Sequence, residues 1–476
     1  MHFSIPDTQE FAEGAGNAYV GYNIHINGLF HCTVRYKQLY NLHVQLSKDL
    51  DMSLPIFPPK KFFPLTPNQQ EERRLALEKY IQSIGQNVAI NNSEILNGFL
   101  LNAQQETVGD LSETETETLD IFLMNGSKIS LNVSTREYSG EILKKVYENI
   151  QLLEKYHSHF ALFIIIQDEL SGNIKILRKL QDFESPFITY KYMSSMGTKI
   201  VLRKSYWDTT YDLELLNDPV TLNLLYVQTA AEIRSGWILT NKDVQYHLEN
   251  MQKSGNRKEY LNIARYLKYY GYIQFAPCYC DYPQHGSKIL LAIGGNELNL
   301  RILSSKEHEI IFKVSRMRCW RITTIQNGMD HPEDNNECSL ELSFEYLIAR
   351  NELQWITIVS EQAILMSVCL QAMIDELLQK CVVGSRIQVE SGKSWTYITR
   401  DGQSRITMGS PLRECANNNH SSKSGPIIKK LASKWSAVTS KKSDESVVDK
   451  TLATCTTADF DIVENNVFRM IGDDDL

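Results

Sequence analysis

The alternation of hydrophobic and polar positions divides the chain into segments with different expected structures. In residues 1–105, alternating apolar positions predict strands, and apolar positions at helical spacing predict helices further on. The expected strands are 19–26 and 28–34, and the expected helices are 71–84 and 94–104. A proline-rich arm, residues 55–61, lies between the two pairs. The pattern therefore predicts a small mixed helix and strand domain.

A hairpin signal marks the next segment, residues 119–205. Asn125-Gly126 stands between two alternating apolar runs, which is the strongest short-range signal for a hairpin. A helix at 140–150 and strands at 160–166, 173–178 and 199–203 are expected to follow. This order predicts a ubiquitin-like unit. The acidic stretch before it, residues 106–118, is expected to be an unpacked linker because it carries like charges and few apolar residues.

The pattern turns helical over residues 206–271. Asp218-Pro219 is typical of an N-cap followed by proline in the first helical turn. A second helix is expected at 258–270, with Gly271 as the residue that ends it.

Residues 272–384 return to strands and end in a helix. The expected strands are 289–293, 298–303, 309–314, 316–324, 340–347 and 354–359. The final helix, 360–380, is apolar on more than one face, so we expect neighbours on both sides of it.

The last segment, residues 385–476, is poor in aromatic residues and rich in serine, threonine, asparagine and lysine. This composition predicts a mostly disordered tail. Two islands interrupt it: a basic amphipathic stretch at 426–438 and the apolar and acidic terminus at 465–476.

Composition narrows the class of protein. A chain of 476 residues with 42% hydrophobic content can fold into roughly three or four domains or lobes. The net charge of −8 argues against general nucleic-acid binding, which leaves a broad basic surface. Nine cysteines without CxxC pairs, and a beginning without a signal-peptide pattern, favour a reducing cytoplasmic setting. The longest apolar run, 160–166, is too short to span a bilayer, so any membrane contact is expected to be peripheral.

Three basic stretches in the first domain carry the chemistry of an anion site. Arg35-Tyr36 joins a bidentate phosphate donor to an aromatic face, and the prolines hold Lys60 on a stiff arm. Arg73 lies near the start of a helix, where backbone N–H groups also favour anions. Each cation alone is most often a solvated surface charge, and Arg74 is expected to pair with Glu78 one turn later.

In this order the three stretches resemble the PX domain, a phosphoinositide-binding module. The resemblance implies that Arg35 contacts the 3-phosphate, that Tyr36 lies under the inositol ring, and that Lys60 and Arg73 complete the site. Lys37 stands where many PX domains carry a small hydroxyl residue, so it would supply charge without that geometry.

The later segments resemble a FERM domain, whose lobes follow one another as a ubiquitin-like unit, a helical bundle and a PTB/PH-like unit. The whole is an α+β multidomain chain that is similar to the PX–FERM sorting nexins. That resemblance rests on the strings at 1–6, 57–61, 202–207, 317–321 and 471–476.

The resemblance implies an adaptor on the early endosome membrane that binds phosphatidylinositol 3-phosphate. Its other implied partners are NPxY or NxxY motifs in the tails of transmembrane receptors, such as the LDL receptor family and integrin beta subunits. The implied tail partner is the Retriever complex, which returns cargo to the cell surface.

The resemblance also places the sites for these partners. The cargo peptide would add to the strand that carries Trp320, with Arg318 as a further contact and Ile374 and Leu378 as the opposite wall. A lone tryptophan in a strand is more often part of the core, so both roles stay open. If Trp320 only lines the groove, Trp320→Ala should remove peptide binding and leave the lobe folded.

The end of the tail offers two motifs. The terminus, Asp473, Asp474, Asp475 and Leu476, combines acidic charge with an apolar residue and a free carboxylate, which suits a basic pocket with an apolar floor. Upstream, Asn465 and Phe468 form an NxxF sequence, one aromatic exchange from the cargo motif. It is either a chance match in a polar tail or a segment that occupies the protein's own cargo groove.

Signals for catalysis and for cofactors are weak. Gly392-Lys393-Ser394 lacks the earlier glycine of a phosphate-binding loop, since Ile387 stands there. Cys278 and Cys280 with His285 lack a fourth metal ligand, so neither a metal nor another cofactor is expected. The expected function is a non-catalytic adaptor. The alternative is a signalling scaffold that binds a small GTPase through the ubiquitin-like lobe, and a lipid-dependent enzyme comes third.

Overall fold

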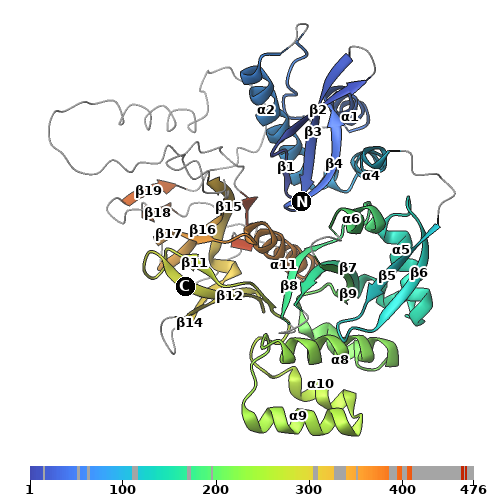
Figure 1. Ribbon diagram of the computed structural model, residues 1–476. Coiled ribbons are helices and arrows are strands. Elements are labelled where there is room, and N and C mark those ends of the chain that lie inside the picture. The colour runs from blue at the N-terminus through green and yellow to red at the C-terminus, as the bar shows by residue number, and fades with distance from the viewer. Residues whose placement is uncertain are drawn as a thin grey trace, which may run out of the picture.

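A computed structural model of the chain (Figure 1) shows a PX unit followed by three lobes. It describes residues 1–13, 17–50, 54–61, 65–109, 116–168, 173–193, 197–303, 309–325, 339–349, 352–384, 394–398, 405–409, 463–465 and 467–468. The predicted segment 426–438 and the terminus 473–476 lie outside these residues.

The PX unit packs a small antiparallel sheet against helices. Its strands are β1 (Phe3–Ser4), β2 (Thr8–Glu13), β3 (Asn17–Ile26) and β4 (Leu29–Arg35), with β3 paired to the other three. Its helices are α1 (Tyr36–Asp49), α2 (Pro67–Gln86), α3 (Val88–Asn91) and α4 (Glu94–Val108). Helix α2 begins after Thr66, whose side chain accepts a hydrogen bond from the Gln69 amide. Leu77 on α2 is fully buried, so the apolar stripe of this helix faces the core, as predicted.

The second unit is a five-stranded sheet with one long helix. Its elements are β5 (Thr116–Phe122), β6 (Lys128–Ser134), α5 (Ser139–Ile150), η1 (Glu154–His159), β7 (Phe160–Gln167), β8 (Ile174–Lys179), α6 (Pro186–Met193) and β9 (Thr198–Lys204). The strand order β6-β5-β9-β7-β8, with β5 parallel to β9, matches the predicted ubiquitin-like unit. The hairpin turn lies at Asn125-Gly126, where Gly126 has a φ of 86° that favours glycine.

The acidic linker is shorter than the sequence predicted. Residues 106–108 belong to α4, and residues 116–118 belong to β5. Glu106 accepts a hydrogen bond from the Gln38 side chain, with 2.7 Å between nitrogen and oxygen. Both ends of the acidic stretch therefore belong to secondary structure, the first to α4 and the second to β5.

The third unit is helical. It contains η3 (Thr209–Tyr211), α7 (Asp212–Leu215), α8 (Pro219–Arg234), α9 (Lys242–Ser254) and α10 (Arg257–Ala264). Asp218 caps α8 as predicted, by accepting hydrogen bonds from the amides of Val220 and Thr221. The predicted helix 258–270 is too long, because α10 ends at Ala264 and turns continue to Gly271.

The fourth unit is a large antiparallel sheet closed by a helix. Its main strands are β10 (Ile273–Gln274), β11 (Cys278–Cys280), β12 (Ser287–Gly294), β13 (Glu297–Ile302), β14 (Glu309–Lys313), β15 (Met317–Ile325), β16 (Ser339–Ala349) and β17 (Glu352–Val359). Between β14 and β15 lies the short helix η4 (Val314–Arg316). Helix α11 (Ala363–Gly384) contributes to a core cluster that also contains residues of β7, β8 and β9, so it has neighbours on both sides, as predicted. In Figure 1 it lies between this sheet and the ubiquitin-like unit.

Three strands come from the segment after α11. They are β18 (Ser394–Ile398), β19 (Arg405–Gly409) and β20 (Val463–Glu464). Strand β18 pairs in parallel with β17, and β20 pairs with β15 at the end of the sheet. The prediction of a mostly disordered tail did not include these strands.

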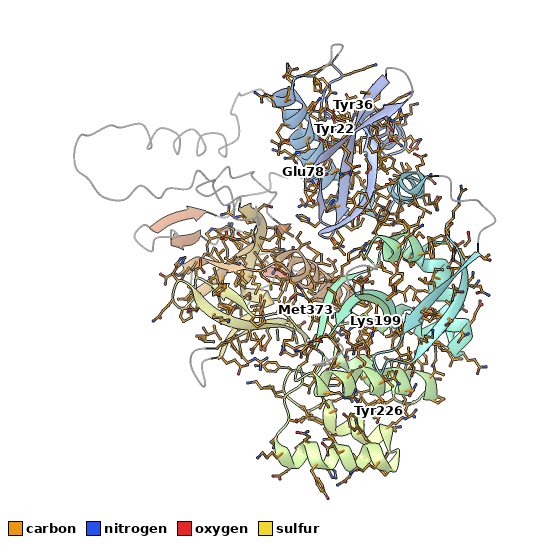
Figure 2. The ribbon with its side chains drawn as sticks, viewed as in Figure 1. Tyr22, Tyr36, Glu78, Lys199, Tyr226 and Met373 are labelled. Atoms are coloured by element: carbon orange, nitrogen blue, oxygen red, sulfur yellow. The ribbon has the colours of Figure 1, made fainter. Side chains whose placement is uncertain are left out.

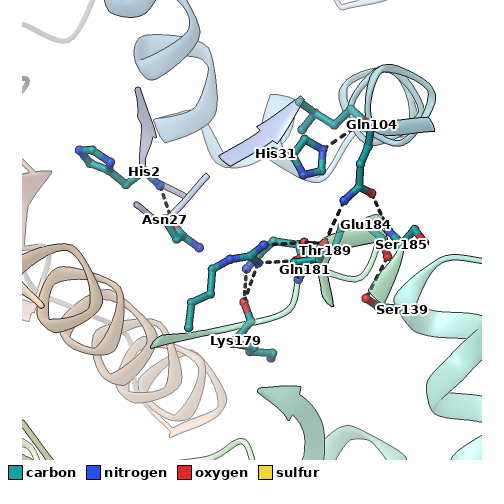
Figure 3. Close-up of polar contacts among 12 residues, drawn as sticks. His2, Asn27, His31, Gln104, Ser139, Lys179, Gln181, Glu184, Ser185 and Thr189 are labelled. Carbon is teal, nitrogen blue, oxygen red and sulfur yellow. Dashed lines mark hydrogen bonds and ion pairs between the residues drawn. The ribbon is translucent and has the colours of Figure 1, made fainter. Parts of the chain in front are cut away.

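The PX unit is joined to the ubiquitin-like lobe by buried polar contacts (Figure 3). The Gln104 side chain on α4 accepts a hydrogen bond from the Ser185 amide at 2.7 Å and donates one to the Thr189 hydroxyl at 2.9 Å. The Thr189 hydroxyl in turn donates to Glu184, which forms a buried ion pair with Arg178. Separation of the two units would therefore break the hydrogen bonds of Gln104 with Ser185 and Thr189.

Candidate functional sites

The first candidate site is built around Tyr36 in the PX unit. Tyr36 begins α1, and its hydroxyl donates a hydrogen bond to the Pro58 carbonyl with 2.8 Å between the oxygens. Its ring centroid lies 5.6 Å from that of Phe57. The proline arm is therefore fixed against α1, and Lys60 follows directly from this anchor with an exposed side chain.

Arg73 on α2 reaches the same place. Its guanidinium carbon lies 4.6 Å from the Tyr36 ring centroid, and Arg73 also hydrogen-bonds Tyr22. Burial raises the pKa of Tyr22, and the Arg73 charge partly offsets that rise. Figure 2 labels Tyr22 and Tyr36 within the PX unit.

One donor of Arg73 supports an anion site. Its Nη2 atom is buried and has no hydrogen-bond partner among the described residues. A buried cationic donor without an acceptor is costly, so an anion that met it would be favoured. The structure therefore brings together Tyr36, Arg73 and the proline arm.

Arg35 takes a different direction from Tyr36. Its guanidinium carbon lies 3.3 Å from the ring centroid of Tyr19 on β3. Arg35, Lys37 and Tyr19 line a groove of about 830 Å³ that also includes Gly21 and Thr33 of the sheet. Lys37 itself is exposed. Sequence reasoning missed Tyr19 and Tyr22, which lie three positions apart on β3 and therefore on opposite faces of the strand.

Arg74 is tied into the fold, as predicted. It forms ion pairs with Glu71 and Glu78 and donates to the Ile5 carbonyl. The neighbouring Arg73 therefore remains the cation of this pair that faces the candidate site.

The second candidate site lies along the edge of β15. Strand β20 runs antiparallel to it, with Trp320 opposite Val463 and Cys319 opposite Glu464. The Asn465 amide continues the pairing by donating to the Arg318 carbonyl at 3.0 Å. A short segment of the tail thus adds a strand to the sheet.

Asn465 fixes the position of this segment. Its side-chain amide donates to the carbonyls of Val314 and Met317 at 2.8 and 2.7 Å, and its oxygen accepts from the Val467 amide at 2.9 Å. The Phe468 amide closes the turn on the Asn465 carbonyl at 3.2 Å. Asn465 is 2% exposed, so these bonds are shielded from water.

The apolar side chains of the segment are also buried. Phe468 forms a small cluster with Leu347 and Leu353. Val467 belongs to the core cluster that contains α11, and Val463 packs against it. The asparagine and the aromatic residue three positions later therefore occupy separate, specific positions on the sheet.

The sequence-predicted groove residues lie on β15 and on α11. Trp320 is fully buried in the same core cluster, and its indole N–H donates to the Ser367 hydroxyl of α11 at 2.8 Å. Ile374 is buried in that cluster and Leu378 packs against it. The Arg318 side chain binds Glu345, and its main chain contacts the tail. Ser367 and the valines were not predicted.

The burial of Trp320 bears on its two possible roles, in the core or in the groove. A side chain with 0% exposure and a hydrogen bond to α11 supports the core of the lobe. This packing leads us to expect instead that Trp320→Ala destabilises the lobe, which unfolding measurements would test.

Four family models match the chain. They are the PX domain at 22–103, the FERM F1 lobe of sorting nexins 17, 27 and 31 at 117–207, the FERM F2 lobe of sorting nexins 17 and 31 at 208–268, and the sorting nexin 17 FERM C-terminal domain at 271–378.

Curated relatives match over the full length. Sorting nexin-17 of Danio rerio is 41% identical over 488 residues, and sorting nexin-17 of Homo sapiens is 39% identical over 485. Both alignments cover 100% of this chain and 100% of the relative. The chain belongs to the sorting nexin 17 family. Sorting nexin-31 of Homo sapiens is 33% identical and covers 85% of this chain and 93% of its own.

A solved structure of a designed CISK-PX domain is 35% identical over 21% of this chain and 97% of its own, with a TM-score of 0.19. The family assignment does not depend on it.

Two other features of this sorting nexin 17 family member bear on its chemistry. Burial raises the pKa of both Cys278 and Cys280 to about 12, so their thiols are poor metal ligands and nucleophiles near neutral pH. Across the part of the chain that the structure describes, no helix is long and apolar enough to cross a bilayer.

Proposed function

We propose that this protein is a non-catalytic cargo adaptor on the early endosome membrane. In this proposal its PX unit binds phosphatidylinositol 3-phosphate, and its last FERM lobe binds NPxY or NxxY motifs of receptor tails. Its C-terminal residues recruit the Retriever complex, so that bound receptors return to the cell surface. Family membership and the two candidate sites support this function together.

The observation that carries the proposal is the tail segment on β15. A peptide with an asparagine and an aromatic residue three positions later already fits this edge, through main-chain pairing and buried side chains. Strand addition to a sheet edge is a general way to bind extended peptides. An NPxY peptide offers the same asparagine and an aromatic residue at the same spacing, so it suits the same positions.

The same observation supports a role for the tail as an internal competitor. Because the segment is tethered, its effective concentration at the groove is high. In this proposal cargo displaces residues 463–468, and displacement frees the acidic end, Asp473 to Leu476, for Retriever. Deletion of Leu476 should then abolish Retriever binding without a change in lipid or cargo affinity.

Peptide-binding isotherms test the proposal. Phe468→Ala in the full-length chain should tighten binding of an NPxY peptide, because the competitor loses its buried aromatic residue. A chain that ends at residue 390 lacks Phe468 and the rest of the competitor, so it should bind the NPxY peptide tightly. Phe460→Ala, an identical change elsewhere in the tail, is the control and should leave the affinity unchanged.

Two results would contradict the proposal at different levels. Equal affinities for full-length, truncated and Phe468→Ala proteins would exclude the internal competitor and leave the cargo site in place. Failure of the truncated protein to bind any NPxY peptide would exclude the cargo site itself.

A further inference from the structure

The outer face of the PX sheet carries a stack of three flat groups. The ring of Phe11 on β2 lies 5.2 Å from the ring of Tyr19 on β3, and the two planes differ by 13°. The Arg35 guanidinium carbon lies 3.3 Å from the centroid of the Tyr19 ring. Three consecutive segments of the sheet therefore contribute one plane each, with the arginine at the end.

Strand register explains why these groups meet. Phe11 is directly opposite Tyr19, and Gly21 is directly opposite Arg35. Because side chains two positions apart share a face, Tyr19 and Gly21 lie on the same side of β3. Tyr19 is therefore the diagonal neighbour of Arg35 on this face of the sheet.

Gly21 makes the stack possible. A Cβ atom at this position would lie 2.6 Å from the Phe11 ring and 2.6 Å from the Thr33 methyl group. Only a residue without a side chain leaves room for Phe11 to lie across the strand and reach Tyr19. Glycine is therefore required here because a side chain would clash, and not because of backbone conformation, since the φ of Gly21 is not positive.

The main chain of Arg35 is held as well. Its amide donates to the Gln38 side-chain oxygen at 2.7 Å, and the Gln38 nitrogen donates to Glu106 at 2.7 Å. Helix α4 therefore helps to fix where the Arg35 backbone lies, and the guanidinium lies against the Tyr19 ring.

We propose that Tyr19 is a positioning residue for the lipid phosphate, acting through Arg35. A guanidinium that rests with its face on an aromatic ring still has its N–H groups in its own plane, directed outward. The ring restricts the rotamers of a long side chain and contacts its flat face, not the edge that binds phosphate. This inference rests on the proposed binding of phosphatidylinositol 3-phosphate.

Sedimentation of the full-length chain with liposomes that contain phosphatidylinositol 3-phosphate tests this role. Tyr19→Leu should weaken binding by about three- to thirtyfold, the range that a cation–π contact supports. Tyr19→Phe keeps the ring and should bind within about twofold of wild type, on the same basis. Tyr266→Leu, at a highly exposed tyrosine outside this groove, is the control and should leave binding unchanged.

A double-mutant cycle separates positioning from a general structural effect. Lysine cannot rest a flat face on the ring as arginine does, so in an Arg35→Lys background Tyr19→Leu should have little further effect. Thermal melts of each variant check the fold. If Tyr19→Leu melts early, Tyr19→Thr, a good strand former, replaces it as the non-aromatic variant.

Three results would overturn the inference. These are wild-type affinity for Tyr19→Leu, fully additive losses in the cycle, and tighter binding by Tyr19→Leu, which would mean that the ring withholds Arg35 from the lipid. A wild-type protein that ignores the 3-phosphate liposomes would instead overturn the proposed lipid function.

Discussion

In the PX unit, residues that are adjacent in sequence can have different roles. Arg73 and Arg74 are adjacent, yet Arg74 is bound to Glu71, Glu78 and the Ile5 carbonyl, whereas Arg73 lies beside Tyr36 with a buried donor unpartnered within the described chain. The helical turn separates the two side chains by about 100°. One arginine therefore stabilises the fold and the other faces the candidate lipid site.

We expect Arg35→Gln to weaken binding to 3-phosphate liposomes by about tenfold or more, because a hydrogen bond to a charged group contributes about 1.5–3 kcal/mol. Liposome sedimentation measures the change. Lys79→Gln on the exposed side of α2 removes the same charge elsewhere and is the control. Unchanged sedimentation of Arg35→Gln would place the phosphate contact on another residue.

The buried imidazole of His31 makes stability depend on pH. Burial lowers the pKa of His31 to about 4, with Glu184 opposing and Arg178 reinforcing that shift. Below about pH 6.5 the unfolded chain binds a proton at His31 and the folded chain does not. Stability should therefore be fully present above pH 6.5 and fall toward pH 4, by up to about 1.4 kcal/mol per pH unit.

Chemical denaturation at pH 7.5 and pH 5.0 checks this expectation. His31→Gln can still donate to the Leu100 carbonyl, which the His31 ring contacts at 3.0 Å, and it should reduce the loss of stability on acidification. Part of the loss should remain, because the pKa of buried His2 is also lowered to about 4. His247→Gln, at an exposed position, should leave the pH dependence as in wild type. An unchanged slope in His31→Gln would show that His31 does not titrate in this range.

At the scale of secondary-structure elements, β15 has two different neighbours. Strand β16 pairs with most of its length, whereas β20 covers only Cys319 and Trp320. β20 is only two residues long, so a longer extended peptide would form more main-chain hydrogen bonds with the same edge. The groove is therefore an edge of the sheet that a segment of the same chain occupies.

We expect Trp320→Ala to destabilise the last lobe by about 3–5 kcal/mol, because it leaves a large cavity between β15 and α11. Trp320→Phe keeps most of the volume and loses the hydrogen bond to Ser367, so its cost should be nearer about 1 kcal/mol. Thermal or denaturant unfolding measures both. If Trp320→Ala has the stability of wild type, the side chain lines a groove and does not support the core.

At the scale of the whole molecule, the PX unit and the FERM lobes share their interior. Phe183 of the ubiquitin-like lobe belongs to the PX core cluster, and its ring meets His31 edge-on at 5.9 Å. Gln104 then links α4 to Ser185 and Thr189 (Figure 3). These contacts fix the PX unit against the ubiquitin-like lobe.

We expect Gln104→Ala to loosen this junction, because it leaves the Ser185 amide without its acceptor and costs about 1–3 kcal/mol. Differential scanning calorimetry should show a PX transition that separates from that of the FERM lobes. Gln105→Ala, which removes only an exposed hydrogen bond to the Arg136 carbonyl, is the matched control. Identical calorimetric profiles for the two variants would contradict a structural role for the junction.

The sequence by itself determined the elements whose signals are local. Asp218-Pro219 begins a helix because the Asp218 side chain accepts hydrogen bonds from amides of the first turn and the proline ring fixes a helical φ. Asn125-Gly126 makes a hairpin because glycine tolerates a positive φ. The resemblance to a FERM domain rested on the succession of such elements, and the resemblance to a PX domain rested on the three basic stretches. Helices α1, α6 and α9 were missed. In α9 only Leu248 is buried, so the apolar stripe that would mark it is narrow.

Only the tertiary structure decided how distant segments meet. Nothing in residues 463–468 predicts a strand, because β20 is two residues long and exists through its pairing with β15. Likewise, Tyr19 becomes a neighbour of Arg35 through the register of β3 and β4, which places Gly21 opposite Arg35. Local propensity acts over a few residues, whereas packing and register join positions far apart in the chain, and both candidate sites depend on the second kind of contact.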